Sequence, residues 1–221
     1  MKLRTLAIGA AAAGILALTA GPALAGHDTN PSPKVASYSY ALDAVQPDAV
    51  PNGDADGTTR IKALPNGKVQ VTVRAEGLAP GLPHAMHLHG SDDGSVDNAC
   101  PGPDAAGDDG VVTVVDGAPF YGGILASLTT TGDTTAASAL ALDRFPVADE
   151  DGSLEYTRTF ENELAFANAD TVQVVVHGID FDDNGAYAFN PGNEYSERGS
   201  SLDPEIPLEA TVPVLCGGIA N

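Results

Sequence analysis

The sequence predicts an all-β fold, either an antiparallel β-sandwich or a β-barrel built from short strands. Apolar and polar residues alternate with a period of two in several segments, which is the pattern of a strand with one buried face. The 25 Gly and 16 Pro residues of the 221-residue chain gather with Asn and Asp in turn-like clusters. Many short strands separated by such turns are typical of sandwiches and barrels.

The clearest strands lie in three segments. Residues 68–74 and 154–160 alternate strictly, and residues 171–177 are more apolar, as expected for a strand buried on both faces. Short helices are expected only near 136–142 and 161–167. Turn clusters separate these elements, at 51–54, 65–67, 79–81, 151–152 and 183–185. Loop or tail composition occurs at 26–34 and 190–207.

The first 25 residues predict a secretory signal peptide. Lys2 and Arg4 precede a long apolar run, and Ala23-Leu24-Ala25 fits a small-residue cleavage site. The remaining 196 residues (221 minus 25), 26–221, have the length of one domain with its own core, a single β-barrel domain whose first residues, 26–36, are expected to be flexible. Since no later segment predicts a membrane span, we expect a secreted, extracellular or cell-envelope protein.

The chain is strongly acidic. It carries 10 Lys and Arg against 30 Asp and Glu, a formal charge of −20, and loss of Lys2 and Arg4 with the signal peptide changes this to 8 against 30, or −22. Such a charge argues against nucleic acid and anionic membrane surfaces as partners, and it is compatible with cation binding.

The chain has two cysteines, Cys100 and Cys216. In an oxidising compartment the expected state is one disulfide between them, with two free buried thiols as the alternative. A bridge across so long a loop would stabilise the fold by roughly 4–5 kcal/mol in the chain-entropy model.

Four of the five histidines lie in two short segments, His84-Ala-Met-His87-Leu-His89 and Val-Val-Val-His177. In a strand, His87 and His89 share one face while the apolar residues beside them share the other. Their Cα atoms would lie about 7 Å apart, so both imidazoles could reach one ion with bonds of about 2 Å. His177 ends a buried strand and is a third candidate. The alternative is a set of hydrogen-bonded structural imidazoles.

These segments together resemble the copper,zinc superoxide dismutase family. Residues 77–89 are similar to the family's G-L-x-P-G-x-H-G-F-H-V-H, residues 174–183 to V-V-V-H-x-x-x-D-D, and residues 215–219 to A-C-G-V-I. Cys100 follows the last histidine of the first segment by 11 residues, near where the family places the partner of its last cysteine. The resemblance runs, with gaps, from about residue 67 to residue 220.

The resemblance implies a Greek-key β-barrel or sandwich and a copper site. By this resemblance, the copper ligands would be His87, His89 and His177, and they would also be the catalytic residues. His84 would support the site without binding the metal, and a Cys100–Cys216 disulfide would tie the loop beside the site to the last strand. Histidine ligands suit copper, which heads the divalent affinity order, and three histidines with water also suit zinc.

The chain also departs from the family pattern. No histidine lies between Cys100 and Val176, where the family has its bridging imidazole and zinc ligands, so a zinc site of the family type is not expected. The family's arginine before the last cysteine is also missing from residues 210–214. An enzyme built this way would be a copper-dependent superoxide dismutase with a copper-only site and a poor field for its anionic substrate, superoxide.

Two functions stay open on the sequence. The first is a secreted copper-binding relative of the dismutases, and the retained histidines and cysteines favour it. The second is a non-enzymatic extracellular binding module that resembles the CHRD type, with a similar β-fold and a G-L-x-x-G…H-x-H segment. The missing bridging histidine and arginine favour this second function.

Two further cation-binding patterns are present. Asp180, Asp182 and Asn184 fit the first half of a D-x-[DN]-x-[DN]-G calcium loop, but Pro191 stands where the distal glutamate is required, so an acidic turn is the preferred interpretation. After cleavage, His27 would be the second residue of the chain. The free amine, an amide nitrogen and this imidazole could chelate Cu(II), although a disordered end is the default expectation.

Overall fold

The computed structural model describes residues 35–48, 50–52, 54–91, 96 and 98–218. The chain divides into two units, Met1–Ser32 and Pro33–Asn221, and every described residue belongs to the second. The signal peptide predicted at residues 1–25 and the segment 26–34 lie outside the described residues.

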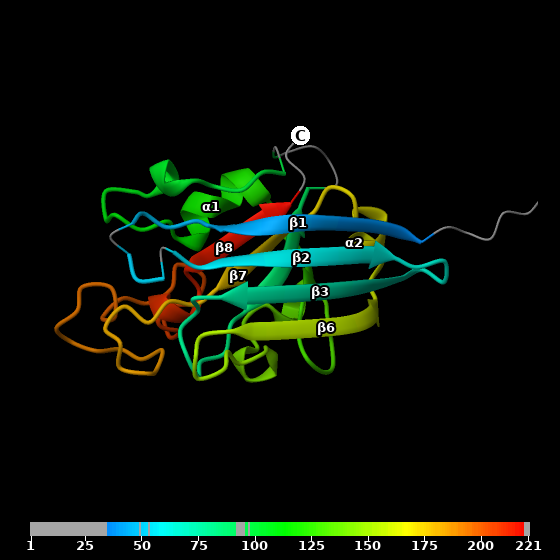
Figure 1. Ribbon diagram of the computed structural model, residues 1–221. Helices are drawn as coiled ribbons and strands as arrows, with labels where there is room; N and C mark the ends of the chain where they lie inside the picture. Colours follow the sequence, from blue (N-terminus) through cyan, green and yellow to red (C-terminus); the bar gives the residue numbers. More distant parts are fainter. Residues whose placement is uncertain (1–34, 49, 53, 92–95, 97, 219–221) are drawn as a thin grey trace, which may run out of the picture. The chain divides into compact units, whose positions relative to one another are not determined.

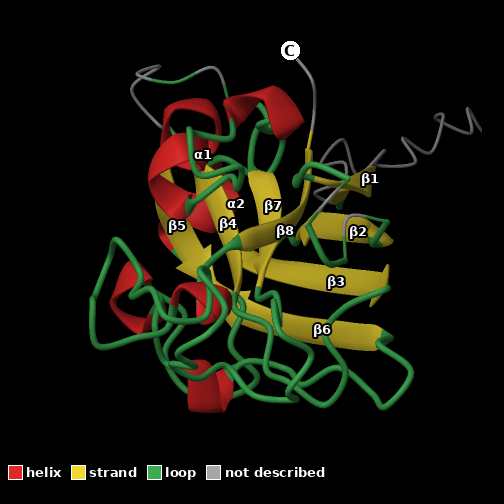
Figure 2. Ribbon diagram, turned by 90° about the vertical axis from the view of Figure 1, so that its left-hand side faces the viewer, coloured by secondary structure: helices red, strands yellow, loops and turns green. Residues whose placement is uncertain are grey.

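The described residues form one hydrogen-bonded sheet of eight strands in the order β5-β4-β7-β8-β1-β2-β3-β6 (Figure 1 and Figure 2). All of its strand pairs are antiparallel. The strands are β1 Ala36–Ala44, β2 Asp56–Ala63, β3 Lys68–Glu76, β4 Met86–Gly90, β5 Gly123–Ser127, β6 Leu154–Glu161, β7 Gln173–His177 and β8 Pro213–Gly218. The predicted strands at 68–74, 154–160 and 171–177 correspond to β3, β6 and β7.

The connection between β3 and β6 makes the topology a Greek key. These two strands pair with each other, but the chain leaves β3, crosses to form the β4–β5 hairpin at the opposite end of the strand order, and returns as β6. Figure 2 shows β4, β5 and β7 running across the direction of β1, β2, β3 and β6, so the sheet curls around its interior. The prediction of an all-β, Greek-key antiparallel fold is confirmed.

Side chains bridge the two edge strands of the curled sheet. Asn162, just after β6, donates to the carbonyl oxygen of Leu125 on β5 at 3.2 Å. Arg158 and Tyr156 of β6 both donate to the carbonyl oxygen of Thr129, just after β5, at 2.7 and 3.2 Å. The gap between β5 and β6 is therefore held by side chains in place of a backbone ladder.

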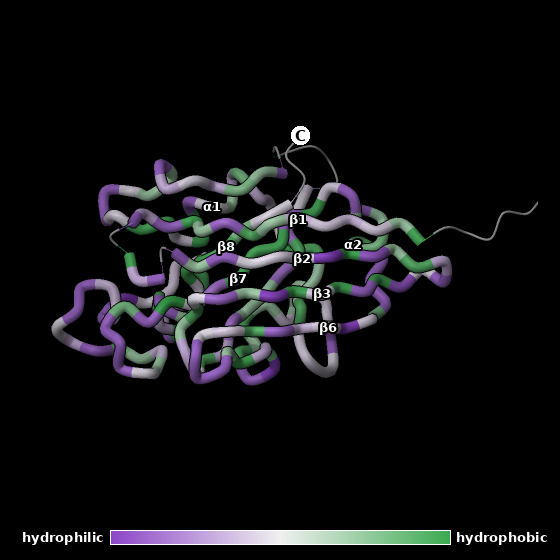
Figure 3. The backbone as a smooth tube through the Cα atoms, viewed as in Figure 1, coloured by the Kyte–Doolittle hydropathy of each residue, from purple (hydrophilic) through white to green (hydrophobic). Residues whose placement is uncertain are grey.

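The alternating segments bury one face each. On β3, Val69, Val71 and Val73 are fully buried in the core cluster, and the residues between them lie on the outer face. Figure 3 shows the resulting alternation of polar and apolar positions along β2, β3 and β6. Each buried valine contributes roughly 1.5–3 kcal/mol of hydrophobic stabilisation relative to full exposure.

Strands β4 and β7 are buried on both faces. Their inward residues join the main core, whereas Val175 on the other face of β7 belongs to a second cluster with Val112, Tyr121 and Cys216. This second cluster is covered by the helix α1, Val114–Tyr121, and the loop before it. The candidate histidines lie in this outer layer.

The sequence prediction missed α1 and is wrong there, since helices were expected only near 136–142 and 161–167. Gly117 and Pro119 disfavour a helix interior, but Thr113 and Asp116 form a capping box, with the Thr113 amide donating to Asp116 Oδ2 at 2.9 Å. Burial of the Tyr121 side chain in the second cluster also stabilises this helix. Figure 2 shows the other helices, α2 at Glu163–Ala167 and 3₁₀ turns at Pro103–Ala105, Ala136–Ser138, Leu142–Arg144 and Leu208–Ala210.

The predicted loop at 190–207 consists of turns with one isolated bridge, between Gly199 and Pro207. In the part of the chain that the structure describes, no helix has the length and apolar character needed to cross a membrane.

Candidate metal centre

Strand pairing brings three histidines to the same face of the sheet. His87 and His89 lie on β4, and His87 is paired with Val175 of β7. His177, two residues further along β7, therefore lies on the same face. Met86 and Leu88 point the other way into the main core, as the sequence predicted.

The three imidazoles are buried and adjacent. Their ring centroids are 5.5 Å apart for His87 and His89, 5.1 Å for His87 and His177, and 6.0 Å for His89 and His177. One ring nitrogen of each residue lies within 4.8 Å of one nitrogen of each of the others. The residues predicted as ligands thus come together from two strands.

One nitrogen of each ring lies at hydrogen-bond distance from a backbone carbonyl oxygen. His87 Nε2 is 3.2 Å from Ala139 O, His89 Nδ1 is 3.0 Å from Gly122 O, and His177 Nδ1 is 2.7 Å from Thr211 O. Because a carbonyl only accepts, these nitrogens carry the hydrogen and donate it. This is the arrangement that fixes the tautomer of metal-binding histidines.

The other nitrogen of each ring has no hydrogen-bond partner among the residues that the structure describes. These buried nitrogens are His87 Nδ1, His89 Nε2 and His177 Nε2. Since the opposite nitrogens hold the protons, these three atoms present lone pairs. Three lone pairs directed into one small volume, without a donor among the described residues, form a ready set of metal ligands.

Burial keeps the three imidazoles neutral. Loss of solvation lowers the pKa of His89 from 6.5 to about 3 and that of His177 to about 4. It also lowers the pKa of His87 well below its usual value, with further lowering by the neighbouring His177 and His89. Neutral imidazoles bind metal without first losing a proton, so near neutral pH the site has no protonation barrier to loading.

A cavity of about 240 Å³ opens above the three imidazoles. Its wall residues include Val114, Ile124, Leu140, Leu202, Ala139 and Thr211. Tyr121 lies over His89, with ring centroids 4.4 Å apart, and none of the described wall residues is Asp, Glu, Lys or Arg. The histidines thus face an apolar pocket without fixed charge.

His84 is fully buried but lies apart from this group. Its Nδ1 is 2.9 Å from the carbonyl oxygen of His177, and its Nε2 is 3.1 Å from that of Ala79. A neutral imidazole can donate to only one of them, and burial lowers the pKa of His84. The supporting role predicted for His84 fits this contact with the backbone of His177, and it stays a prediction.

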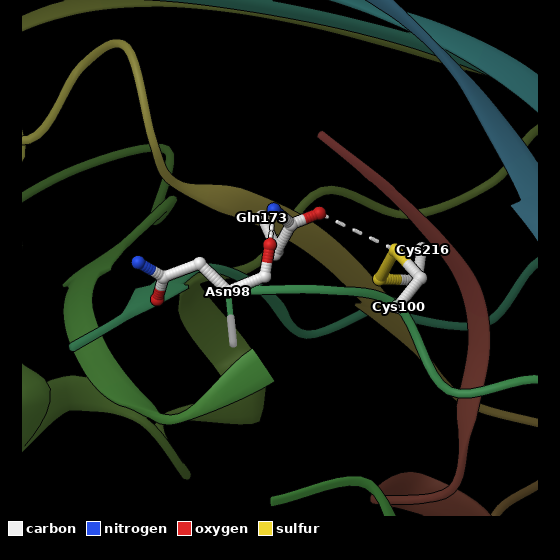
Figure 4. Close-up of a disulfide and its surroundings, with 4 residues drawn as sticks. All are labelled: Asn98, Cys100, Gln173 and Cys216. Atoms are coloured by element: carbon white, nitrogen blue, oxygen red, sulfur yellow. Dashed lines mark hydrogen bonds between the residues drawn. A yellow bond between two sulfur atoms is a disulfide. The ribbon is translucent and has the colours of Figure 1, made fainter. Parts of the chain in front are cut away.

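The predicted disulfide between Cys100 and Cys216 is present, with the two Cα atoms 5.7 Å apart. It attaches the loop before α1 to β8. Gln173 of β7 fixes the same loop by donating to the carbonyl oxygen of Asn98, and its Oε1 lies 3.5 Å from Cys100 Sγ (Figure 4). At the neighbouring Gly217, a Cβ would lie 1.9 Å from Ala41 O, so a glycine is required where β8 meets β1.

The predicted calcium loop forms a tight turn. The Asp180 carboxylate accepts from the backbone amides of Asn184 and Gly185, at 3.2 and 2.7 Å. Asp180 and Asp182 gather with Glu209, a residue that the sequence prediction did not include. Glu209 is fully buried and accepts from the Phe181 and Ala188 amides and the Ser196 hydroxyl. Calcium binding here stays a prediction.

The residues that complete the histidine site were not foreseen. Ala139, Gly122 and Thr211 act through backbone carbonyls, which leave no signature in sequence, and Tyr121 lies on the unexpected helix α1. Leu140 and Leu202 come from loops.

Comparison with known proteins gives no family assignment. No protein family and no curated protein matches the chain. Among solved structures, superoxide dismutase 5 of Candida albicans with Cu(II) is similar at 17% identity over 64% of this chain and 84% of that chain, with a TM-score of 0.35. A mutant of the same protein gives 11% identity over 83% and 88%, also with a TM-score of 0.35.

Proposed function

We propose that the protein binds copper through His87 Nδ1, His89 Nε2 and His177 Nε2. The observation that carries this proposal is the convergence of three buried nitrogens without hydrogen-bond partners. A buried polar atom without a partner costs about 1–3 kcal/mol. Three such atoms facing one another are costly unless a ligand occupies the space between them.

The residues fit a metal ion in chemistry and spacing. Nitrogens bound about 2 Å from one ion lie roughly 3.3–4 Å from one another, and one ring nitrogen of each histidine lies within 4.8 Å of those of the others, close to that spacing. Neutral histidines are ligands for copper and for zinc, and copper has the higher affinity for a given set of nitrogen donors. The three histidines line the pocket, so an ion held by them would be accessible from it.

When bound, copper supplies one-electron chemistry between two oxidation states. The chain's own part is to hold the ion with three oriented imidazoles and to surround its open side with apolar groups. Superoxide dismutation is the activity that the sequence resemblance implies. However, no Lys or Arg is among the described residues of the pocket wall, so the wall itself adds no positive charge beside the ion to attract an anion. Superoxide consumption is therefore an outcome to be measured, and copper binding is the proposed function.

The alternative of a non-enzymatic module with structural histidines accounts less well for the site. The structural histidine His84 lies with its ring nitrogens 2.9 and 3.1 Å from two backbone carbonyl oxygens, and the neutral ring donates to one of them. Each of the other three histidines has one nitrogen without a hydrogen-bond partner among the described residues, and these three residues lie together. A purely structural role gives no compensation for that cost.

We also propose that the protein acts outside the cytoplasm. The leader-like residues 1–25 and the Cys100–Cys216 disulfide support export to an oxidising compartment. Amino-terminal sequencing of the protein from culture medium or cell envelope tests this, and a chain that begins at Gly26 is the expected result.

Copper content tests the proposed site. The chain 26–221, with its disulfide formed and with His27→Ala to remove any amino-terminal chelate, should bind close to one copper ion per chain. His89→Gln removes a ligand and should reduce the affinity by at least tenfold, because one of three donors is lost. Asp180→Asn changes the acidic group Asp180, Asp182 and Glu209 and serves as the control that should keep its copper.

Two results would contradict the proposal. One is a folded His27→Ala chain that binds no copper. The other is a folded His89→Gln chain that binds it as tightly as the parent. Superoxide consumption by the copper-loaded protein is measured separately, and copper binding without consumption excludes dismutation while leaving the metal site in place.

A further inference from the structure

The pocket above the histidines offers few free polar atoms. The Tyr121 hydroxyl donates to Val114 O at 3.4 Å, and the Thr211 hydroxyl contacts Ser200 Oγ at 2.9 Å and Leu208 O at 3.2 Å. Each histidine has one nitrogen engaged with a carbonyl. Among the described wall residues, the side-chain polar atoms without any hydrogen-bond partner are the three histidine nitrogens at the base of the pocket.

The rest of the wall selects against charge. Val114, Ile124, Leu140 and Leu202 supply apolar surface, and no described wall residue could neutralise an ionised group. Moving an ion into such surroundings costs several kcal/mol without a paired charge. The formal charge of residues 26–221, 8 Lys and Arg against 30 Asp and Glu or −22, adds repulsion for anions. In the metal-free protein, an organic occupant of the pocket therefore has to be neutral.

The volume of the pocket sets the size of the occupant. An apolar cavity of about 150 Å³ stays dry and binds benzene, and this pocket measures about 240 Å³. It has room for one six-membered ring with a substituent. Aromatic groups already surround the site, since Tyr121 lies over His89 and Phe145 contacts His87 edge to face at 5.4 Å. Ring against ring contacts of this kind add about 0.5–1.5 kcal/mol beyond burial.

We propose that this pocket binds a small, uncharged aromatic alcohol of the phenol class. The ring lies against the apolar wall and the hydroxyl points to the histidines. In the metal-free protein the hydroxyl donates to one of the unpartnered nitrogens. In the copper-loaded protein the oxygen faces the open side of the ion, and this second part rests on the proposed function, whereas occupancy of the pocket does not.

Three probes with one benzene ring each separate the contribution of the hydroxyl from the effect of charge. They are phenol, toluene and benzoate. Calorimetry on the metal-free chain 26–221 at pH 7 should show phenol binding at least tenfold more tightly than benzoate, which is charged, and more tightly than toluene, which lacks a donor. Leu140→Lys places a cation in the pocket wall and should weaken phenol and strengthen benzoate. Leu164→Lys is the matched control, because Leu164 on α2 is 46% exposed and is not part of the wall.

A second readout uses the metal. Phenol should shift the Cu(II) electron paramagnetic resonance spectrum of the copper-loaded protein, and toluene should not. A spectrum that phenol leaves unchanged overturns the part of the proposal that places the hydroxyl at the ion.

The outcomes separate the two proposals. A protein that binds copper but no phenol, or that binds benzoate as tightly as phenol, overturns the inference and leaves copper binding intact. A protein that binds phenol in a manner sensitive to Leu140→Lys, but binds no copper, supports the pocket and overturns the metal site. Equal effects of Leu140→Lys and Leu164→Lys place the ligand elsewhere and overturn the inference.

Discussion

Acidification should destabilise the metal-free protein through its buried histidines. In the fold, His89 and His177 keep low pKa values, about 3 and about 4. In the unfolded chain both return to about 6.5. Above pH 6.5 neither state binds the proton and the folded state keeps its full stability. As the pH falls from 6.5 towards 4 and 3, only the unfolded chain takes up these protons, so the free energy of unfolding decreases.

The magnitude follows from the two pKa values of each residue. Between pH 7 and pH 5, a histidine that shifts from 6.5 to about 3 or 4 reduces the free energy of unfolding by about 2 kcal/mol. His89 and His177 together give roughly 4 kcal/mol, and the lowered pKa of His87 acts in the same direction. This is a large part of the 5–15 kcal/mol typical of a domain.

Urea unfolding at pH 7 and pH 5, with a chelator present, measures this effect. His89→Gln should lose about 2 kcal/mol less than the parent between the two pH values, because glutamine does not titrate. The carboxylates are the same in both proteins and contribute equally to both, so the comparison isolates His89. Equal losses in the parent and in His89→Gln would refute the argument that His89 is buried and neutral.

Three further predictions concern the scaffold. Replacing both Cys100 and Cys216 by serine opens a loop with a sequence separation of 116 and should lower the free energy of unfolding by about 4–5 kcal/mol in urea titrations; a loss under about 1 kcal/mol contradicts it. Gly178→Ala places a Cβ 2.1 Å from the Tyr187 hydroxyl at a φ of +114°, whereas Gly185→Ala at +78° meets no atom within 4 Å. Thermal melts should therefore show a loss for Gly178→Ala that exceeds the loss for Gly185→Ala by about 1–3 kcal/mol, and equal losses would exclude the packing explanation. Glu209→Gln puts an amide donor against the donors that Glu209 now accepts from, and should destabilise the fold by about 1–3 kcal/mol, with unchanged stability as the contradicting result.

The strand pattern could be predicted from sequence because it depends on local periodicity. Residues 68–74 alternate, and they form β3 with Val69, Val71 and Val73 inside. The same two-residue period separated His87 and His89 from Met86 and Leu88. The disulfide also followed from the presence of only two cysteines in a chain expected to be exported.

The pocket could not be predicted, because it depends on contacts between distant segments. The carbonyls of Gly122, Ala139 and Thr211 orient the histidines through the backbone, which carries no residue-specific signal. Helix α1 was not predicted, because Gly117 and Pro119 disfavour a helix interior. Glu209 meets Asp180 only because the chain returns before β8. The apolar character of the wall therefore became visible only in three dimensions.

The location of bound copper is the most direct test of the metal site. Anomalous diffraction at the copper absorption edge, from crystals of the copper-loaded His27→Ala chain, should show one strong peak about 2 Å from His87 Nδ1, His89 Nε2 and His177 Nε2. No peak between these atoms, or the main peak at Asp180, Asp182 and Glu209, would contradict copper binding by the three histidines.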